Sequence, residues 1–389
     1  MNLRLLTAGE SHGPAMTAIL EGMPAGLPLD AAVIDHELAR RQRGLGSGAR
    51  MQIERDSVKI LSGVLAGQTT GAPIALLVEN DDHVNWKGKP VAAMSAPRPG
   101  HADLAGALKY GFNDLRPALE RASARETTMR VAAGAICRHF LAQFGILVGG
   151  FVRAIDGESM QGDVQDYPAC LSAAEASELR CPDAAAAKRM RACMQQAIEE
   201  KDTVGGVVEI FALNLPVGLG SYVQGDRRLG ARLAGALASV PSVKGVEIGD
   251  GFAAAGLRGS QAQDAIRLDS GRLRRAGNHA GGVEGGISNG QPLVLRAALK
   301  PIASTLAPQP TVDLAAGVET HTNYVRSDSC HVPRAVPVLE AVTAFVLADA
   351  LLEKLGGDTL AELQVRFAAL RKAQLADLSL DDSDKVWWV

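Results

Sequence analysis

Aromatic side chains and long apolar runs are both scarce in this chain. Phe, Trp and Tyr make up 4% of its 389 residues, which disfavours the stacked aromatic platforms that bind single-stranded nucleic acid. The 40 Lys and Arg nearly balance the 43 Asp and Glu, so no broad basic surface for nucleic acid is expected. The sequence shows no uninterrupted run of 18 apolar residues and no signal peptide, which predicts a cytoplasmic chain without a membrane span.

Cysteine and the common ligand motifs are scarce as well. The five cysteines are an odd number without a C-x-x-C pair, so we expect neither a disulfide framework nor a cysteine zinc site, and a reducing cytosol fits. The eight histidines contain no H-x-x-x-H pair, and no metal is expected. The P-loop pattern is missing, and the glycine-rich "AGGVEGGISNG" lacks G-x-G-x-x-G, so neither common nucleotide fingerprint is present.

What the chain does have is enough apolar residues for a large core, 47% of the total. Hydrophobic spacing predicts a mixed α+β chain. Strands are expected at 3–9, 204–216 and 291–301, with a hairpin at 58–80. Helices are expected at 30–44 with Asp30 as N-cap, at 119–145, at 226–240 and at 336–356, where Gly356 ends the last of them.

The domain organisation follows from the lack of repeats and low-complexity linkers. Two long helical segments among hairpins argue against a regular βαβ alternation, so we expect a single domain over 1–389. The polar, poorly patterned stretch at 156–186 is expected to be a surface excursion. The acidic tail at 377–389 is expected to be loosely held, with a subunit contact as the alternative.

The segment "TAGESHGPA" fits G-x-S-x-G, the nucleophile elbow of α/β-hydrolases, with Ser11 as the nucleophile. An elbow needs a strand within a sheet, an oxyanion loop contributed earlier in the chain, and a helix behind the serine. Only eight residues precede Gly9, and Pro14, Gly22 and Pro24 oppose a long helix after Ser11. The hydrolase interpretation is therefore disfavoured.

Several short polar segments combine histidine, arginine and glycine. His12 lies in "GESHG", His101 in "RPGHAD", Ser123 in "ERASARET" and Asp328 in "RSDSC". Taken singly, each has an ordinary explanation as a solvated turn or an exposed helix face. Together they describe a site that can expel phosphate. Arginine binds phosphate through two parallel hydrogen bonds, and a histidine can protonate the leaving oxygen.

These segments, with others in the same order along nearly the whole chain, resemble the chorismate synthase family. The matching stretches are "TAGESHG", "LARRQRG", "RPGHADLAGALKYGF", "RPALERASARETTMRVAAGA", "DTVGGVVE", "VKGVEIGDGF", "AGGVEGGISNGQPL", "KPIAST", "TVDL" and "RSDSCHVPRAVPVLEA". One match could arise by chance, but ten in the family's order could not. The stretch 156–186 and the last dozen residues are not covered.

The resemblance implies a carbon–oxygen lyase that performs the last step of the shikimate pathway. The reaction is an anti 1,4-elimination of phosphate from 5-enolpyruvylshikimate 3-phosphate, giving chorismate for aromatic amino acid biosynthesis. Reduced FMN is the implied cofactor: it lends electron density as the allylic C–O bond breaks, and its N5 helps remove the C6 proton. NADPH is a candidate reductant of that flavin. The implied fold is a single-domain β-α-β sandwich with antiparallel sheets and central helices, and the implied assembly is a homotetramer.

The resemblance also implies roles for individual residues. His12 matches the histidine that protonates the departing phosphate, with Ser11 in its proton network, and His101 matches the histidine that assists protonation of reduced flavin. Asp328 matches an acidic residue near the flavin. The substrate anions are expected to be bound by Arg41, Ser47, Arg50, Arg98, Arg125 and Arg326. The flavin contacts are expected at Arg121, Ala122, Ser123, Pro241, Ser242, Gly285, Lys300, Pro301, Ile302, Ala303, Ser304 and Arg326.

Two sites depart from the family's pattern. Where many relatives have "GYGRG", this chain has "GLGSG", so Ser47 replaces an arginine assigned to anion or NADP contact. A lost charge-assisted hydrogen bond costs about 1.5–3 kcal/mol. The other arginines that match the family's anion-binding residues are retained. We therefore expect Ser47 to weaken the binding of NADPH more than it weakens the elimination reaction. Pro241 and Ser242 stand where the family more often has an amide residue and alanine.

Two other function classes are also compatible with the sequence. A flavin reductase would use the same flavin pocket for net hydride transfer, and a non-catalytic paralogue would bind an anion for assembly or regulation. The presence of both His12 and His101 argues against the paralogue. A lyase, unlike a reductase, turns over without stoichiometric NADPH once its flavin is kept reduced.

Overall fold

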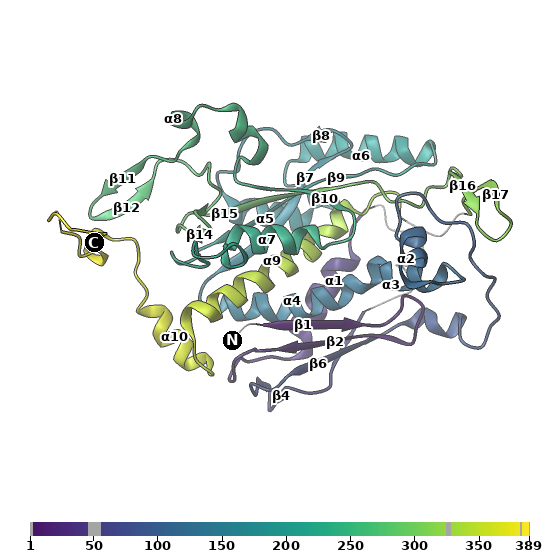
Figure 1. Ribbon diagram of the computed structural model, residues 1–389, viewed down its shortest axis with the longest axis horizontal. Helices are drawn as coiled ribbons and strands as arrows, with labels where there is room; N and C mark the ends of the chain where they lie inside the picture. The colour runs from purple at the N-terminus through teal and green to yellow at the C-terminus, as the bar shows by residue number, and fades with distance from the viewer. Residues whose placement is uncertain (1–2, 46–55, 324–327, 382, 389) are drawn as a thin grey trace.

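The computed structural model describes residues 3–45, 56–323, 328–381 and 383–388. Two antiparallel sheets enclose a layer of helices, so the chain is a β-α-β sandwich (Figure 1). One hydrophobic core cluster runs through the layers, from Leu3 near the N-terminus to Leu363 near the C-terminus. The α+β sandwich expected from the resemblance is confirmed.

The first sheet has the strand order β1-β2-β6-β3, formed by Arg4–Ala8, Ala15–Glu21, Ile74–Glu79 and Val58–Ile60. All three pairings are antiparallel. Alternate side chains of β2 and β6 are buried, which is the period-2 pattern of a sheet with one face on the core. The expected hairpin at 58–80 forms as the β3–β6 pair, with a smaller β4–β5 hairpin (Val64–Leu65 and Gln68–Thr69) between its strands.

The second sheet has the order β10-β15-β9-β7-β8. Its strands are Val243–Ile248, Leu293–Leu299, Gly206–Leu213, Leu147–Ile155 and Glu158–Ser159. The strands expected at 204–216 and 291–301 are therefore confirmed as β9 and β15. The inward face of β9 carries Val208, Ile210 and Ala212 into the main core.

The helical layer consists of α1, α4, α7 and α9, formed by Ala31–Gln42, Thr127–Ala142, Leu229–Ala238 and Val332–Leu355. Asp30 caps α1 as expected, because its side chain accepts a hydrogen bond from the Val33 backbone N–H. The central pair α4 and α9 cross closely (Figure 1). Gly134 makes this approach possible, since a Cβ there would lie 2.3 Å from the Cβ of Ala341.

The prediction of a single helix over 119–145 is wrong. The chain forms α3 (Arg116–Ala122), turns at Ser123, makes the 3-10 turn η3 (Ala124–Glu126) and then begins α4. Ser123 has extended backbone angles, and its side chain accepts a hydrogen bond from the Arg125 N–H. Serine at such a position offers the backbone an alternative to helix continuation, which the alanine-rich composition concealed.

The last long helix begins earlier than Val336, the start that the sequence predicts. Pro333 lies in the first turn of α9, where a missing N–H costs nothing, and Pro337 is accommodated one turn later. Gly356 ends the helix with a positive φ of 61°. By length and composition α9 could cross a membrane, but 94% of its most apolar window is buried inside the protein, so it is a core helix.

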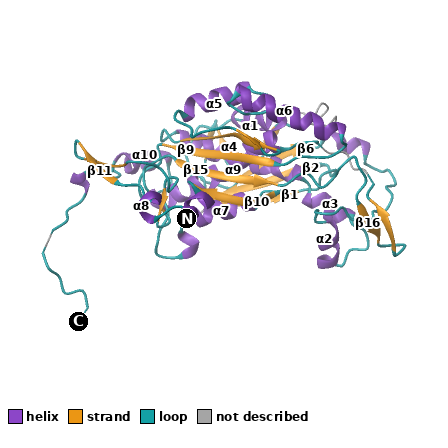
Figure 2. Cartoon of the chain, turned by 90° about the horizontal axis from the view of Figure 1, so that it is seen from above, coloured by secondary structure: helices purple, strands orange, loops and turns teal. Residues whose placement is uncertain are grey.

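Residues 156–186 contain the short strand β8 and the helix α5 (Tyr167–Ala176). Tyr167, Leu171 and Ala174 pack with Phe151 and Phe211 in a second, smaller hydrophobic cluster. This packing anchors the segment to β7 and β9, and α6 (Ala184–Glu199) begins in its last residues (Figure 2).

The other described elements are shorter. They are η2 (Asp81–Asn85), α2 (Asp103–Tyr110), η4 (Gly225–Arg227), η5 (Gly251–Gly256), α8 (Gly259–Ala262), β11 (Ile266–Asp269), β12 (Arg272–Arg275), β13 (Val283–Glu284), β14 (Ile287–Ser288), β16 (Pro310–Asp313), β17 (Val318–His321), α10 (Leu360–Ala368) and η6 (Leu375–Asp377). Beyond η6 the described tail is irregular, and Trp387 and Trp388 are exposed.

Candidate active site

A cavity of about 1790 Å³ opens among the ends of both sheets and the helical layer. Its walls come from the β1–β2 loop, the loop before α2, the turn between α3 and α4, the α7–β10 turn, the segment after β15 and the start of α9. Ligand pockets usually measure about 300–1,000 Å³, so this cavity has room for a substrate and a cofactor together.

His12 lies on the β1–β2 loop and lines the cavity. Its Nδ1 is 2.8 Å from Oε1 of Glu120 on α3, and its backbone N–H donates to Oε2 of the same carboxylate at 2.9 Å. Burial alone would raise the pKa of Glu120, but the hydrogen bonds from His12 bring that pKa below its ordinary value. Glu120 is therefore ionised at neutral pH and holds both the loop and the imidazole ring.

Trp86 and Arg116 complete the surroundings of His12. The rings of His12 and Trp86 lie 4.1 Å apart between centroids. The indole N–H of Trp86 donates to Asp82 at 3.0 Å, and the Arg116 guanidinium lies 5.7 Å from the Trp86 ring centre. Trp86 thus lies against the His12 ring, and Arg116 lies against Trp86. Nothing in the pattern of the sequence singles out Trp86.

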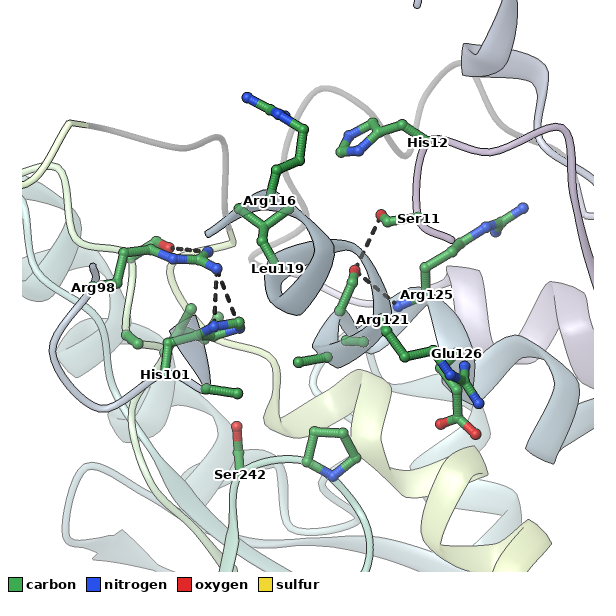
Figure 3. A pocket seen from close by; sticks show the side chains of 18 of the residues that line it. Ser11, His12, Arg98, His101, Arg116, Leu119, Arg121, Arg125, Glu126 and Ser242 are labelled. Carbon is green, nitrogen blue, oxygen red and sulfur yellow. Dashed lines mark hydrogen bonds between the residues drawn. The ribbon is translucent and has the colours of Figure 1, made fainter. Parts of the chain in front are cut away.

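His101 lies across the cavity from His12, in the loop before α2 (Figure 3). Its Nδ1 is 2.6 Å from Oδ1 of Asp103, which is completely buried. Asp103 also accepts from the backbone N–H of Arg98 at 3.1 Å and from its guanidinium at 2.8 Å. Burial would raise the pKa of Asp103, but the hydrogen bonds from His101 and Arg98 lower it well below its ordinary value.

The segment after β15 reaches the same side of the cavity. Arg98 donates to the hydroxyl of Ser304 at 3.2 Å, and the ammonium of Lys300 donates to the carbonyl of Gly100 at 2.8 Å. Burial, and then the nearby charge of Lys244, lower the pKa of Lys300. Lys300, Ile302, Ala303 and Ser304 line the cavity.

Ser11 is buried beside His12, and its hydroxyl accepts a hydrogen bond from Ser123 at 3.1 Å (Figure 3). Its backbone N–H donates to the Glu120 carbonyl at 3.3 Å. The chain continues from this loop into the strand β2 and not into a helix. The strand-turn-helix geometry of a nucleophile elbow is therefore absent around Ser11.

Arg41 and Arg125 are both buried at the cavity wall and share one carboxylate. Asp56 lies 2.6 Å from Nη1 of Arg125 and 3.5 Å from Nη1 of Arg41. Arg41 also donates to Thr127 and to the carbonyl of Ala124. Guanidinium groups at this wall suit an anionic ligand, because they can bind it through charge-assisted hydrogen bonds.

Arg121, Ala122 and Ser123 line the floor of the cavity. Arg121 donates to the hydroxyl of Thr7 at 2.9 Å, and that hydroxyl donates in turn to Glu126 at 2.9 Å. Pro241 and Ser242 line the cavity from the α7–β10 turn. Ser242 has a positive φ of 74°, and its carbonyl accepts from the Lys300 N–H. The turn and the segment after β15 are thus joined.

Asp328 lines the cavity just before α9 and forms an ion pair with Arg334. His331, between them, also lines the cavity, although sequence analysis gave it no role. Burial lowers its pKa to about 4, so the ring is neutral at pH 7. Neither ring nitrogen has a hydrogen-bond partner among the described residues.

Not every expected site residue is brought into this cavity. Ser47, Arg50 and Arg326 lie outside the described residues. Pro301 and Gly285 are described but are not among the residues that line the cavity, and Gly285 lies between the strands of the β13–β14 hairpin. Within the described ranges, no group of three or more His, Cys, Asp or Glu side chains is placed to hold a metal ion.

Sequence analysis missed the carboxylates that hold the expected groups in place. Glu120 directly precedes Arg121 in "LERASARET", and Asp103 follows His101 by two residues, so both stood inside quoted segments. Asp56 had no such signal, because its partners Arg41 and Arg125 are distant along the chain.

Comparison with known proteins decides the family. The sequence model of chorismate synthase matches residues 3–352. The chain belongs to the chorismate synthase family. It is 50% identical over 379 residues to the chorismate synthase of Trichlorobacter lovleyi, covering 93% of this chain and 97% of that protein. It is 50% identical over 384 residues to the chorismate synthase of Aquifex aeolicus, covering 94% and 96%.

A solved crystal structure of a chorismate synthase has the same fold. It is 44% identical, covers 95% of this chain and 97% of its own, and gives a TM-score of 0.77. Membership of the chorismate synthase family makes the chain a lyase that converts 5-enolpyruvylshikimate 3-phosphate into chorismate, a step of aromatic amino acid biosynthesis. The family uses reduced FMN.

Proposed function

We propose that the cavity between His12 and His101 carries out this elimination, with His12 as the acid that protonates the departing phosphate. The observation that carries the proposal is that both histidines, and the expected arginines Arg41, Arg98 and Arg125, line one cavity. Protonation of the leaving oxygen stabilises the charge that develops when the C–O bond breaks. The arginines bind the substrate phosphate and carboxylates through charge-assisted hydrogen bonds.

The cavity fits FMN as well as the substrate. Its volume of about 1790 Å³ exceeds that of a pocket for one small ligand. We assign the flavin to the side formed by Ser242, Lys300 and Ser304, where hydroxyl and ammonium donors face the space. When bound, reduced flavin supplies electron density to the breaking allylic C–O bond. Asp103 orients His101 toward this space, and Lys300 supplies a positive charge beside it.

Ser11 is a hydrogen-bonding group in this proposal. Its hydroxyl accepts a hydrogen bond from Ser123, so it links the loop that carries His12 to the turn between α3 and α4. The remaining assignments rest on the resemblance. They are, for the flavin, Arg121, Ala122, Pro241, Gly285, Pro301, Ile302, Ala303 and Arg326, and, for the substrate, Ser47, Arg50 and Arg326. Asp328 is proposed to act near the flavin while Arg334 holds its carboxylate.

We also propose that the chain functions in the cytoplasm as a homotetramer of single-domain subunits, the assembly implied by the family. The main core cluster, which joins both sheets, supports one domain. NADPH is proposed only as a source of electrons for the flavin, since the elimination itself involves no net redox change.

The deciding experiment is an anaerobic assay with 5-enolpyruvylshikimate 3-phosphate and photoreduced FMN. We expect equal amounts of phosphate and chorismate, released without NADPH. A flavin reductase would instead consume NADPH stoichiometrically and release no phosphate, and a non-catalytic paralogue would do neither. Absence of phosphate release from folded, FMN-loaded protein would refute the proposal.

A further inference from the structure

The contact between Glu120 and His12 determines the position of the β1–β2 loop and also the orientation and protonation of the His12 ring. Both oxygens of the Glu120 carboxylate are used by the same residue, one by the ring Nδ1 and the other by the backbone N–H of His12. The Glu120 side chain is only 11% exposed, and that of His12 is 17% exposed. One largely buried carboxylate therefore holds both the backbone position and the ring orientation of His12.

The charge on Glu120 settles which nitrogen carries the hydrogen. An ionised carboxylate can only accept hydrogen bonds. The hydrogen in the 2.8 Å contact must then belong to Nδ1 of His12. When the imidazole is neutral, Nε2 is consequently the nitrogen without a proton, and it is the one that gains or gives a proton during the reaction.

The plane of the ring is set by a second contact. The Trp86 ring lies 4.1 Å from the His12 ring, tilted by 39°. Trp86 is held by its hydrogen bond to Asp82, so it does not depend on His12 for its own orientation. With one edge on Glu120 and one face on Trp86, the imidazole has little freedom to rotate.

We propose that Glu120 is a positioning residue that keeps His12 in the Nδ1–H tautomer, so that Nε2 delivers the proton to the departing phosphate. The inference rests on the proposed function of His12. The proton leaves Nε2 and binds the phosphate oxygen, which keeps the electron pair of the broken C–O bond. The Nδ1 proton stays on the ring, and the carboxylate stabilises the imidazolium before the transfer without becoming protonated.

The first test measures the tautomer directly by ¹⁵N NMR of the full chain labelled at histidine. The His12 signals are assigned from their loss in His12→Gln. In the wild type with a neutral ring we expect a protonated Nδ1 and an unprotonated Nε2. In Glu120→Gln, which removes the charge at nearly constant shape, we expect a shift toward the Nε2–H tautomer that predominates in free imidazole side chains.

A matched control is Glu126→Gln. Glu126 is a buried carboxylate that lines the cavity, and its hydrogen bonds go to Thr7 and Arg130. We expect the His12 signals to be unchanged in this variant. Glu120→Asp keeps the negative charge but places it one methylene further from His12, so part of the Nδ1–H population should remain. It provides a second variant if Glu120→Gln does not fold.

The second test is anaerobic phosphate release with photoreduced FMN. We expect Glu120→Gln to lower kcat at least about tenfold, with KM changed less than about threefold. This loss is smaller than the roughly 100- to 10,000-fold that acid–base catalysis contributes, because the variant keeps His12 itself. The inference is overturned if the His12 tautomer is the same in Glu120→Gln and wild type, or if the tautomer changes while kcat does not. Wild-type protein that releases no phosphate would refute the proposed function, whereas the NMR result would still test the role of Glu120.

Discussion

Nδ1 of His101 lies 2.6 Å from Oδ1 of Asp103, and this carboxylate also holds Arg98. Because Asp103 is completely buried, it is the common support for a group expected to act on the flavin and one expected to bind the substrate. A change at Asp103 should therefore disturb both functions at once.

Asp103→Asn should destabilise the fold by about 3–5 kcal/mol, because it leaves the largely buried guanidinium of Arg98 without its counter-charge. The effect should depend on pH. Although burial alone would raise the pKa of Asp103, its hydrogen bonds with His101 and Arg98 lower that pKa in the folded state. The wild type therefore gains stability above the ordinary Asp pKa of about 3.9 and loses it as pH falls toward the folded-state value.

Urea unfolding of wild type and Asp103→Asn between acidic and neutral pH measures this dependence. The difference in unfolding free energy should be largest at neutral pH and should narrow in acid. A difference that stays constant across the range would mean that Asp103 is not held as the ionised form.

His12→Ala and His101→Ala should each lower turnover at least about tenfold, because each removes a group expected to transfer a proton. The measurement is anaerobic phosphate release with photoreduced FMN, with thermal unfolding to verify the fold. His36→Ala is a suitable control, since His36 is an exposed residue of α1. Near-native turnover in either cavity variant would show that its assigned role is wrong.

Ser11→Ala should reduce turnover less than either histidine variant. Its hydroxyl accepts a neutral hydrogen bond from Ser123, and a bond of this kind is worth about 0.5–1.5 kcal/mol. Treatment of the wild type with an organophosphate should leave Ser11 unmodified in mass spectrometry. A covalent adduct on Ser11 would restore the nucleophile interpretation.

Ser47→Arg should increase NADPH-driven reduction of FMN about tenfold, the scale of one charge-assisted hydrogen bond. The prediction comes from "GLGSG" in the sequence, because Ser47 lies outside the described residues. Serine can donate one hydrogen bond but cannot form the paired contact of arginine with phosphate. NADPH oxidation is measured in the presence of FMN, and phosphate release with pre-reduced FMN should change little. Equal NADPH kinetics in both proteins would make Ser47 a neutral substitution.

Gly134→Ala should destabilise the protein by about 1–3 kcal/mol, the usual cost of overpacking a core. The new Cβ would lie 2.3 Å from the Cβ of Ala341 and 2.8 Å from its carbonyl oxygen, so α4 and α9 would have to separate. Gly235→Ala in α7 is the matched control, because nothing lies within 4 Å of a Cβ there. It should stabilise by about 0.4–1 kcal/mol. Similar melting temperatures for the two variants would refute the close-approach explanation.

Much of the local structure could be predicted from the sequence. The strands β1, β9 and β15 and the helices α1 and α7 coincide with predicted segments, because their hydrophobic period and caps are local properties. The short motifs were also sufficient to indicate the family, since their residues and order are written in the chain itself.

The interruption between helices α3 and α4 at Ser123 depends on tertiary structure. Helix propensity favours continuation through this alanine-rich region, but the chain turns so that Ser123 contacts Ser11 and Arg125 reaches Asp56. Those contacts join segments far apart in sequence, and no local pattern contains them.

The residue types of the site are evident from the sequence: two histidines, a set of arginines and the glycine-rich loops around them. How these residues are paired depends on the packing of distant segments. His12 receives its carboxylate from Glu120, 108 residues away, and Arg41 and Arg125 share Asp56 from yet another segment. A buried charge is stable only beside a counter-charge. Which counter-charge is within reach depends on how the sheets and helices pack, not on spacing along the chain.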